Sequence, residues 1–147
     1  MATYNSDVYN NSVPLPGHVG DGGRNVTLYS QPIRITTAIT SSDSGTVFTP
    51  PKGFTVLYTI IKASDLDTAS SPSLTLNVGI SGTAAKFVSA STVGQAGTAA
   101  QSIIAGGCGY QFDGSTAVVW ARAAGPGTGA TGTIEIWMVG YYAATAL

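Results

Sequence analysis

The sequence predicts an all-β fold: a two-sheet antiparallel sandwich of jelly-roll type with an extended N-terminal arm. Three observations lead to this prediction. Apolar and polar residues alternate with period two along most of the chain after residue 24, as in half-buried strands. Gly and Pro clusters interrupt the alternation at intervals of roughly ten residues, which is typical of sandwiches. No segment carries the 3.6-residue period of an amphipathic helix.

The N-terminal segment, residues 1–24, is predicted to be an extended arm. Pro14, Pro16 and four glycines between residues 17 and 23 exclude regular structure there. The segment nevertheless carries spaced apolar residues that could anchor it on a partner. These anchors are Tyr4, Val8, Tyr9, Val13 and Leu15. The alternative is a frayed chain end, which is the default for a terminus.

The rest of the chain, residues 25–147, is predicted to form one sandwich domain of seven to nine strands, and a length of 147 residues fits a single domain. Period-two alternation and short apolar runs place the strands. They are expected at 26–29, 33–39, 46–49, 54–63, 74–80, 86–91, 101–104, 117–123 and 133–142.

Two of these strands carry informative patterns. The strand 133–142 alternates Ile134, Ile136 and Met138 with outward residues that include Glu135 and Trp137. The strand 54–63 has apolar residues on both faces. One face would carry Phe54, Val56, Tyr58 and Ile60, and the other Leu57, Ile61 and Ala63. A strand of this kind is expected to be central and covered on both sides.

Low charge limits the function classes. Charged residues make up 9% of the chain, against about 25% in an average domain. Gly, Ala and Thr occur 19 times each and Ser 15 times, and hydrophobic residues make up 44%, which excludes a disordered chain. Six scattered Lys and Arg residues exclude an electrostatic nucleic-acid binder. The sequence shows neither a secretory signal nor a membrane span, so we expect a soluble protein made in the cytoplasm of a cell.

The sequence contains few residues that could form a catalytic site. His18 is the only histidine and lies among Pro and Gly residues, so a nucleophile and base cannot be assembled in the usual way. Cys108 is the only cysteine and lies among glycines, which favours a small buried filler. Asp65 and Asp67 could offer oxygen ligands to Ca²⁺, but a turn at a strand end is the simpler interpretation. We therefore expect no enzyme, no cofactor and no metal.

Aromatic residues leave a further alternative open. Trp and Tyr side chains could stack on sugars, or they could serve as core or subunit-interface residues. The candidates are Tyr58, Tyr110, Trp120, Trp137, Tyr141 and Tyr142.

Four segments carry a family resemblance. They are 46–54 (TVFTPPKGF), 58–65 (YTIIKASD), 73–80 (SLTLNVGI) and 132–142 (GTIEIWMVGYY). In this order they resemble the small virion proteins of tailed bacteriophages, especially capsid decoration (cement) proteins with a jelly-roll body and an N-terminal arm. The resemblance covers residues 25–142. It implies homotrimers on the capsid exterior that bind the major capsid protein and bridge neighbouring capsid subunits.

A different class of function stays open beside the cement protein. The chain could be a head-fibre, tail or spike module that binds a host receptor or carbohydrate. Such a module needs exposed aromatic residues in loops, and the loops 41–45, 64–73 and 92–100 contain none. The sequence therefore favours the cement protein. A strand with two apolar faces also predicts self-association, because a sandwich covers only one face, and the resemblance makes that association a trimer.

Overall fold

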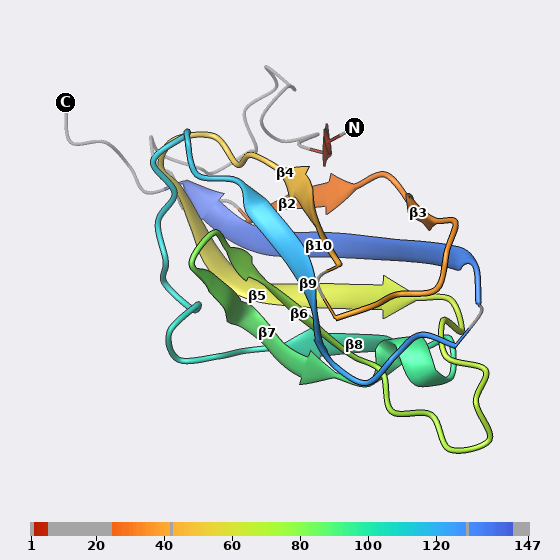
Figure 1. Ribbon diagram of the computed structural model, residues 1–147. Coiled ribbons are helices and arrows are strands. Elements are labelled where there is room, and N and C mark those ends of the chain that lie inside the picture. Colours follow the sequence, from red (N-terminus) through yellow and green to blue (C-terminus); the bar gives the residue numbers. More distant parts are fainter. Residues whose placement is uncertain (1, 6–24, 42, 129, 143–147) are drawn as a thin grey trace, which may run out of the picture.

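The computed structural model describes residues 2–5, 25–41, 43–128 and 130–142, which form two β-sheets packed face to face (Figure 1). In these residues the chain forms ten strands and one 3₁₀ helix, η1 (Val93–Gln95). The predicted all-β antiparallel sandwich is confirmed. The part of the chain described contains no helix long and apolar enough to cross a membrane.

The strand order is that of a jelly roll. One sheet has six strands, in the order β1 (Ala2–Asn5), β2 (Asn25–Ser30), β10 (Gly132–Tyr142), β5 (Phe54–Ala63) and β8 (Ala99–Ser102), with β3 (Ile33–Ile35) also pairing with β10. The other sheet has the order β4 (Ser44–Phe48), β9 (Val118–Ala124), β6 (Thr75–Ile80) and β7 (Thr83–Ser91). Without β1 and β3, two four-stranded antiparallel sheets face each other. From β4 onward, every connection except the β6–β7 hairpin crosses to the opposite sheet.

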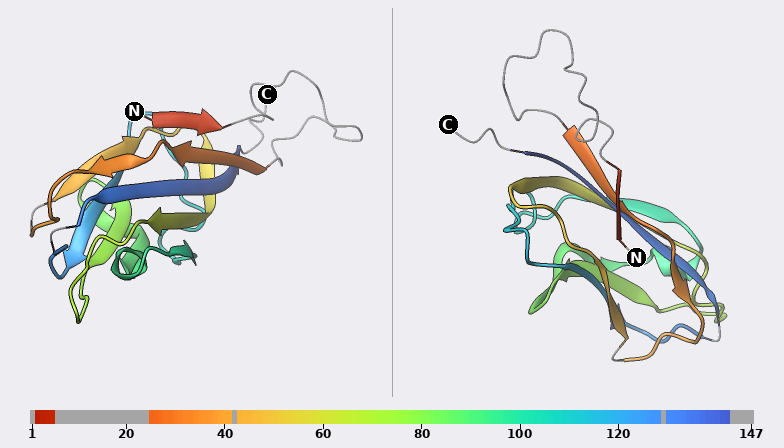
Figure 2. Two further views of the ribbon diagram at one scale, coloured as in Figure 1. Left: turned by 90° about the vertical axis from the view of Figure 1, so that its right-hand side faces the viewer. Right: turned by 90° about the horizontal axis from the view of Figure 1, so that it is seen from above.

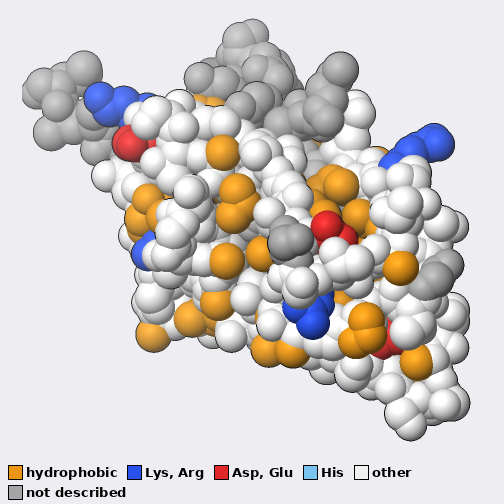
Figure 3. Space-filling model, viewed as in Figure 1, with side chains coloured by type: hydrophobic (Ala, Val, Ile, Leu, Met, Phe, Trp, Pro, Cys, Tyr) orange, Lys and Arg blue, Asp and Glu red, His pale blue; other side chains and the backbone are white. Residues whose placement is uncertain are grey.

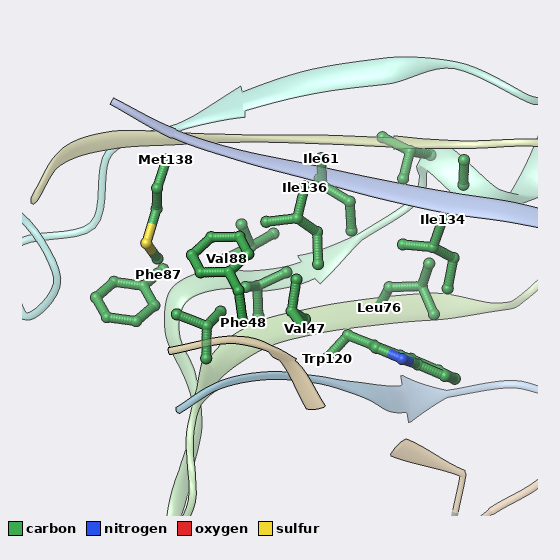
Figure 4. Close-up of a cluster of buried hydrophobic side chains, with 14 of the residues drawn as sticks. Val47, Phe48, Ile61, Leu76, Phe87, Val88, Trp120, Ile134, Ile136 and Met138 are labelled. Carbon is green, nitrogen blue, oxygen red and sulfur yellow. The ribbon is translucent and has the colours of Figure 1, made fainter. Parts of the chain in front are cut away.

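The core lies between the two sheets and follows the predicted alternation. Ile134, Ile136 and Met138 of β10 are fully buried. Across the core they face side chains of the four-stranded sheet, among them Leu76 and Trp120 (Figure 4). The inward residues of β10 thus fix the direction of the outward ones, because successive side chains of a strand point to opposite faces.

The prediction that β5 is covered on both sides was wrong. Its register with β10 steps from Val139–Tyr58 to Gly140–Val56, so Leu57 is an extra residue in a β-bulge. The bulge shifts the alternation by one residue. The core-facing residues are Phe54 and Val56 before it and Thr59, Ile61 and Ala63 after it, and Thr55 between the first two is buried as well. Each predicted face therefore mixes two directions. Tyr58 and Ile60, expected beside Phe54 and Val56, point away from the core, and Ile61 and Ala63, expected on the other face, point into it.

The predicted strand 33–39 is also shorter than expected. Only Ile33–Ile35 pairs with β10, and Gln31 and Pro32 interrupt the edge between β2 and β3. Pro32 has no N–H to donate to a ladder, so a break there is expected. Opposite the break, the backbone N–H of Ile136 donates to the hydroxyl of buried Ser30 at 2.9 Å. The side chain of Ser30 thus replaces a missing backbone acceptor.

The first residues of the chain differ from the predicted arm. Ala2–Asn5 forms strand β1 and pairs antiparallel with β2, from Ala2–Ser30 to Asn5–Thr27. These residues precede the Pro and Gly cluster, and the outer edge of β2 offers them unpaired backbone groups. Tyr4 therefore belongs to a strand. The other predicted anchors, Val8, Tyr9, Val13 and Leu15, lie outside the described residues.

Candidate functional site

Large apolar side chains gather on the outer face of the six-stranded sheet. This surface, here called the aromatic face, consists of Tyr29, Tyr58, Ile60, Trp137, Val139 and Tyr141. Each is half-buried except Val139, which is 9% exposed. The inward positions of the same strands carry core residues, so the alternation directs these six side chains away from the core.

Strand register brings the six residues into adjacent rows. In one row, Trp137 of β10 lies opposite Tyr29 of β2 on one side and Ile60 of β5 on the other. In the next row, Val139 lies between Thr27 and Tyr58. Directly opposite residues on one face have Cβ atoms about 4.5–5.5 Å apart, so these side chains lie side by side on one continuous surface.

Among the described residues of this sheet face, charge is confined to one end. Lys62 and Glu135 lie opposite each other, one row beyond Trp137, and their side chains form an ion pair at 3.5 Å. The Lys62 side chain is 54% exposed, so the pair contributes at most about 1 kcal/mol. The six residues of the aromatic face carry no charge, and a partner could cover them without stripping water from an ion.

The remaining aromatic candidates lie in the core or pack against it. Trp120 is 5% exposed and packs between the sheets. Tyr110 stacks edge-on against Phe87 and Phe112, and Tyr142 does the same against Phe54. Of the six aromatic candidates, only Tyr58, Trp137 and Tyr141 face outward. Tyr29 and Ile60 were not among the candidates, although the alternation of Tyr29 with Leu28 already pointed it away from the core.

The outer face of the four-stranded sheet is different. Figure 3 views the molecule from this side and shows small scattered apolar spots with few charges between them. A shallow groove there is lined by small side chains such as Thr46, Ala84 and Ala121. Trp and Tyr are the residues that most often dominate binding energy at interfaces. The two outer faces are therefore unequal, and the aromatic face is the stronger candidate.

Asp67 organises a loop instead of offering a metal site. The side chain is 2% exposed, and its carboxylate accepts hydrogen bonds from the backbone N–H groups of Ser73 at 2.6 Å and Leu74 at 2.9 Å. The Thr128 hydroxyl donates to the other oxygen at 2.9 Å. These bonds, led by that of Leu74, lower the pKa of Asp67 to about 2, although burial opposes the shift. Both carboxylate oxygens are already occupied.

Asp65 supports the same turn. Its carboxylate accepts the backbone N–H of Asp67 at 3.2 Å, which is the local bond of an Asx turn. In the chain segments that the structure describes, no three His, Cys, Asp or Glu side chains gather where they could hold a metal ion.

Cys108 is exposed, so the prediction of a buried filler was wrong. The backbone N–H groups of Gly107 and Cys108 both bond the carbonyl of Ile104 and form a tight turn. Gly107 is the buried residue of this turn, since a Cβ there would lie 2.4 Å from the Lys86 carbonyl oxygen. His18 lies outside the described residues.

Comparison with solved structures identifies two similar chains, both from phage capsids. A chain of the cyanophage Pam1 capsid asymmetric unit superposes with a TM-score of 0.75 at 34% sequence identity, over 97% of this chain and 99% of that one. The chain belongs to the family of this phage capsid chain. A phage capsid chain of this family is a structural component of a virion, and the relationship supports a non-enzymatic role.

A second phage capsid gives the same result. A chain of the capsid of Ralstonia phage GP4 superposes with a TM-score of 0.69 at 27% identity, over 92% of this chain and 93% of that one. For the 147-residue chain described here, no family model matches, and no curated protein matches either. The two likenesses extend over nearly the whole chain, so both sheets of the sandwich are shared with these phage capsid chains.

Proposed function

We propose that the protein is a cement protein that decorates the exterior of a tailed-phage head. Homotrimers bind the major capsid protein and bridge neighbouring capsid subunits. The aromatic face carries this proposal, because it is an uncharged surface with Trp137 at its centre and Tyr29 and Ile60 on either side. Aromatic residues in such central positions are typical of binding hot spots.

The size and charge of the chain support a role beside a shell. A chain of 147 residues is short for the shell subunit of a tailed phage, and an arm with one Arg is unsuited to packaging nucleic acid. A surface with few charges suits a protein that works docked against other protein. A cement protein needs neither the size of a shell subunit nor a basic arm, because its partner is the protein shell and not the genome.

A binding assay on undecorated heads tests this proposal. The purified protein is added to heads that lack it, and bound protein is measured after sedimentation. Truncating a central hot-spot residue costs about 2 kcal/mol or more, so Trp137→Ala should weaken binding roughly 30-fold. Far-ultraviolet circular dichroism of each variant checks that the sandwich is intact.

Two isoleucines provide a matched control. Ile60→Ser removes an apolar residue of the aromatic face, and Ile103→Ser makes the same change at a residue that is 67% exposed elsewhere. Only Ile60→Ser should weaken binding. Equal binding by both variants would show that the aromatic face is not the docking surface. If the wild-type protein does not bind the heads but binds host glycans, it is instead a receptor- or carbohydrate-binding module.

A further inference from the structure

Arg34 places a positive charge at one end of the outer face of the six-stranded sheet. It is exposed, and its neighbours in β3 point inward, since Ile35 is buried and Ile33 packs against the core. Alternation therefore directs Arg34 to the side that carries the aromatic face. Strand β3 follows β2 along the same side of β10 (Figure 2). Arg34 thus belongs to the same outer surface as Tyr29 and Trp137.

The register gives the distance between this charge and the aromatic face. Arg34 lies opposite Thr133, and the next outward residues of β10 are Glu135 and then Trp137. A strand rises about 3.4 Å per residue, so Arg34 lies about 14 Å along β10 from Trp137. A docked protein segment of about five extended residues would span both positions.

Among the residues that the structure describes, no negative charge is available to Arg34. Glu135 is the acidic residue closest to it in the register, and its carboxylate is paired with Lys62 at 3.5 Å. The described aspartates accept hydrogen bonds from the backbone of their own turns and loops. The described part of this face therefore carries one uncompensated positive charge, at Arg34.

A groove beside Arg34 has room for an anion. Its volume is about 650 Å³, it is open to solvent, and its lining includes Arg34, Thr36 and Thr131. Both threonines are exposed, and their hydroxyls can donate hydrogen bonds. An arginine guanidinium presents parallel N–H groups that match the two oxygens of a carboxylate. The groove therefore suits a carboxylate of a docked protein.

We propose that an Asp or Glu carboxylate of the major capsid protein pairs with Arg34 when the aromatic face docks on the shell. This inference rests on the proposed cement function. The aromatic face provides uncharged contact area, and Arg34 at its end fixes the direction in which the shell segment lies across it. A cation beside a covered surface loses water, so a shell surface without a negative charge there would bind more weakly.

Charge reversal at Arg34 tests the pairing on undecorated heads. Arg34→Ala should weaken binding about tenfold and Arg34→Glu about 100-fold at low salt, because the reversed charge repels the shell carboxylate. Both losses should shrink as the salt concentration rises. Lys52→Glu is the matched control, since Lys52 is also exposed and lies in the turn at the opposite end of β5. The unfolding midpoint of each variant checks that the sandwich is intact.

A zero-length cross-link identifies the source of the carboxylate. On heads decorated with the Arg34→Lys variant, a water-soluble carbodiimide activates carboxylates, and the introduced amine displaces the urea by-product to form an amide. Peptide mass spectrometry should then show residue 34 joined to an Asp or Glu of the major capsid protein. A link only to a second copy of this chain, or no link at residue 34, would overturn the proposal.

The outcomes separate this inference from the cement function. If Arg34→Glu binds heads as tightly as the wild type, the pairing is overturned and the cement function stands. If the wild-type protein does not bind heads at all, the cement function is overturned and the pairing with it.

Discussion

The hydroxyl of Ser30 accepts a hydrogen bond from the backbone N–H of Ile136 at the one place where the edge beside β10 is interrupted. Backbone pairing stops on β2 at Tyr29 and resumes on β3 at Ile33, so Ile136 faces the gap. Both residues are buried, and water cannot replace the bond without opening the edge. The Ser30 side chain thus provides the Ile136 N–H of strand β10 with an acceptor where Pro32 interrupts the neighbouring strands.

Removing that acceptor should destabilise the sandwich. Ser30→Ala leaves a buried N–H without a partner, which costs about 1–3 kcal/mol. Urea unfolding should show a lower midpoint with an unchanged slope. Ser89→Ala, at an exposed position of β7, is the matched control and should unfold like the wild type. Equal midpoints for Ser30→Ala and the wild type would mean that another group replaces the hydroxyl.

Gly140 should tolerate no side chain. It lies at the register step opposite the β5 bulge, and a Cβ there would lie 2.1 Å from the Thr55 carbonyl oxygen and 2.7 Å from the Phe54 ring. Gly140→Ala must therefore displace backbone and should cost about 3 kcal/mol, at the upper end of overpacking effects. Gly106→Ala is the control, because no atom lies within 4 Å of a Cβ there. Thermal unfolding of the two variants should differ clearly, and similar midpoints would contradict the register.

The sequence predicts the sheets of this protein better than their irregularities. Period two identified β10 and its inward residues, because each strand side faces one environment throughout. It could not reveal the bulge at Leu57, since one inserted residue in an apolar run looks like a second apolar face. The same ambiguity hid the outward direction of Ile60, and with it part of the aromatic face. The pairing of β1 depends on a free edge far along the chain, which local pattern does not show.

Acid should remove the contribution of Asp67. Its folded-state pKa is about 2, against 3.8 for the ordinary carboxyl. Because the folded-state value is the lower one, the charged carboxylate stabilises the fold above about pH 4, and this contribution is lost as the pH falls through 2. Asp67→Asn should therefore lower the melting temperature at pH 6 and have a much smaller effect at pH 2.

A carboxylate with weaker contacts provides the comparison for Asp67. Glu135→Gln removes only the surface ion pair with Lys62 and should change stability by less than about 1 kcal/mol at pH 6. If Asp67→Asn destabilises equally at pH 6 and pH 2, the amide disturbs the loop for steric reasons and the charge is not responsible.

Deleting residues 1–24 should leave the sandwich folded and weaken attachment to the head severely. The described core residues run from Val26 to Met138, so circular dichroism should remain that of a β protein. Each apolar anchor contributes about 1.5–3 kcal/mol if fully buried, but ordering the segment costs about 1–2 kcal/mol per residue. One segment alone gains little, and the three linked copies of the proposed trimer raise avidity by about 10²–10⁴. A full-length chain with Val8, Tyr9, Val13 and Leu15 replaced by Ser keeps β1 and separates the anchors from the strand. If this variant and the truncated protein both decorate heads as tightly as the wild type, residues 1–24 have no role in attachment.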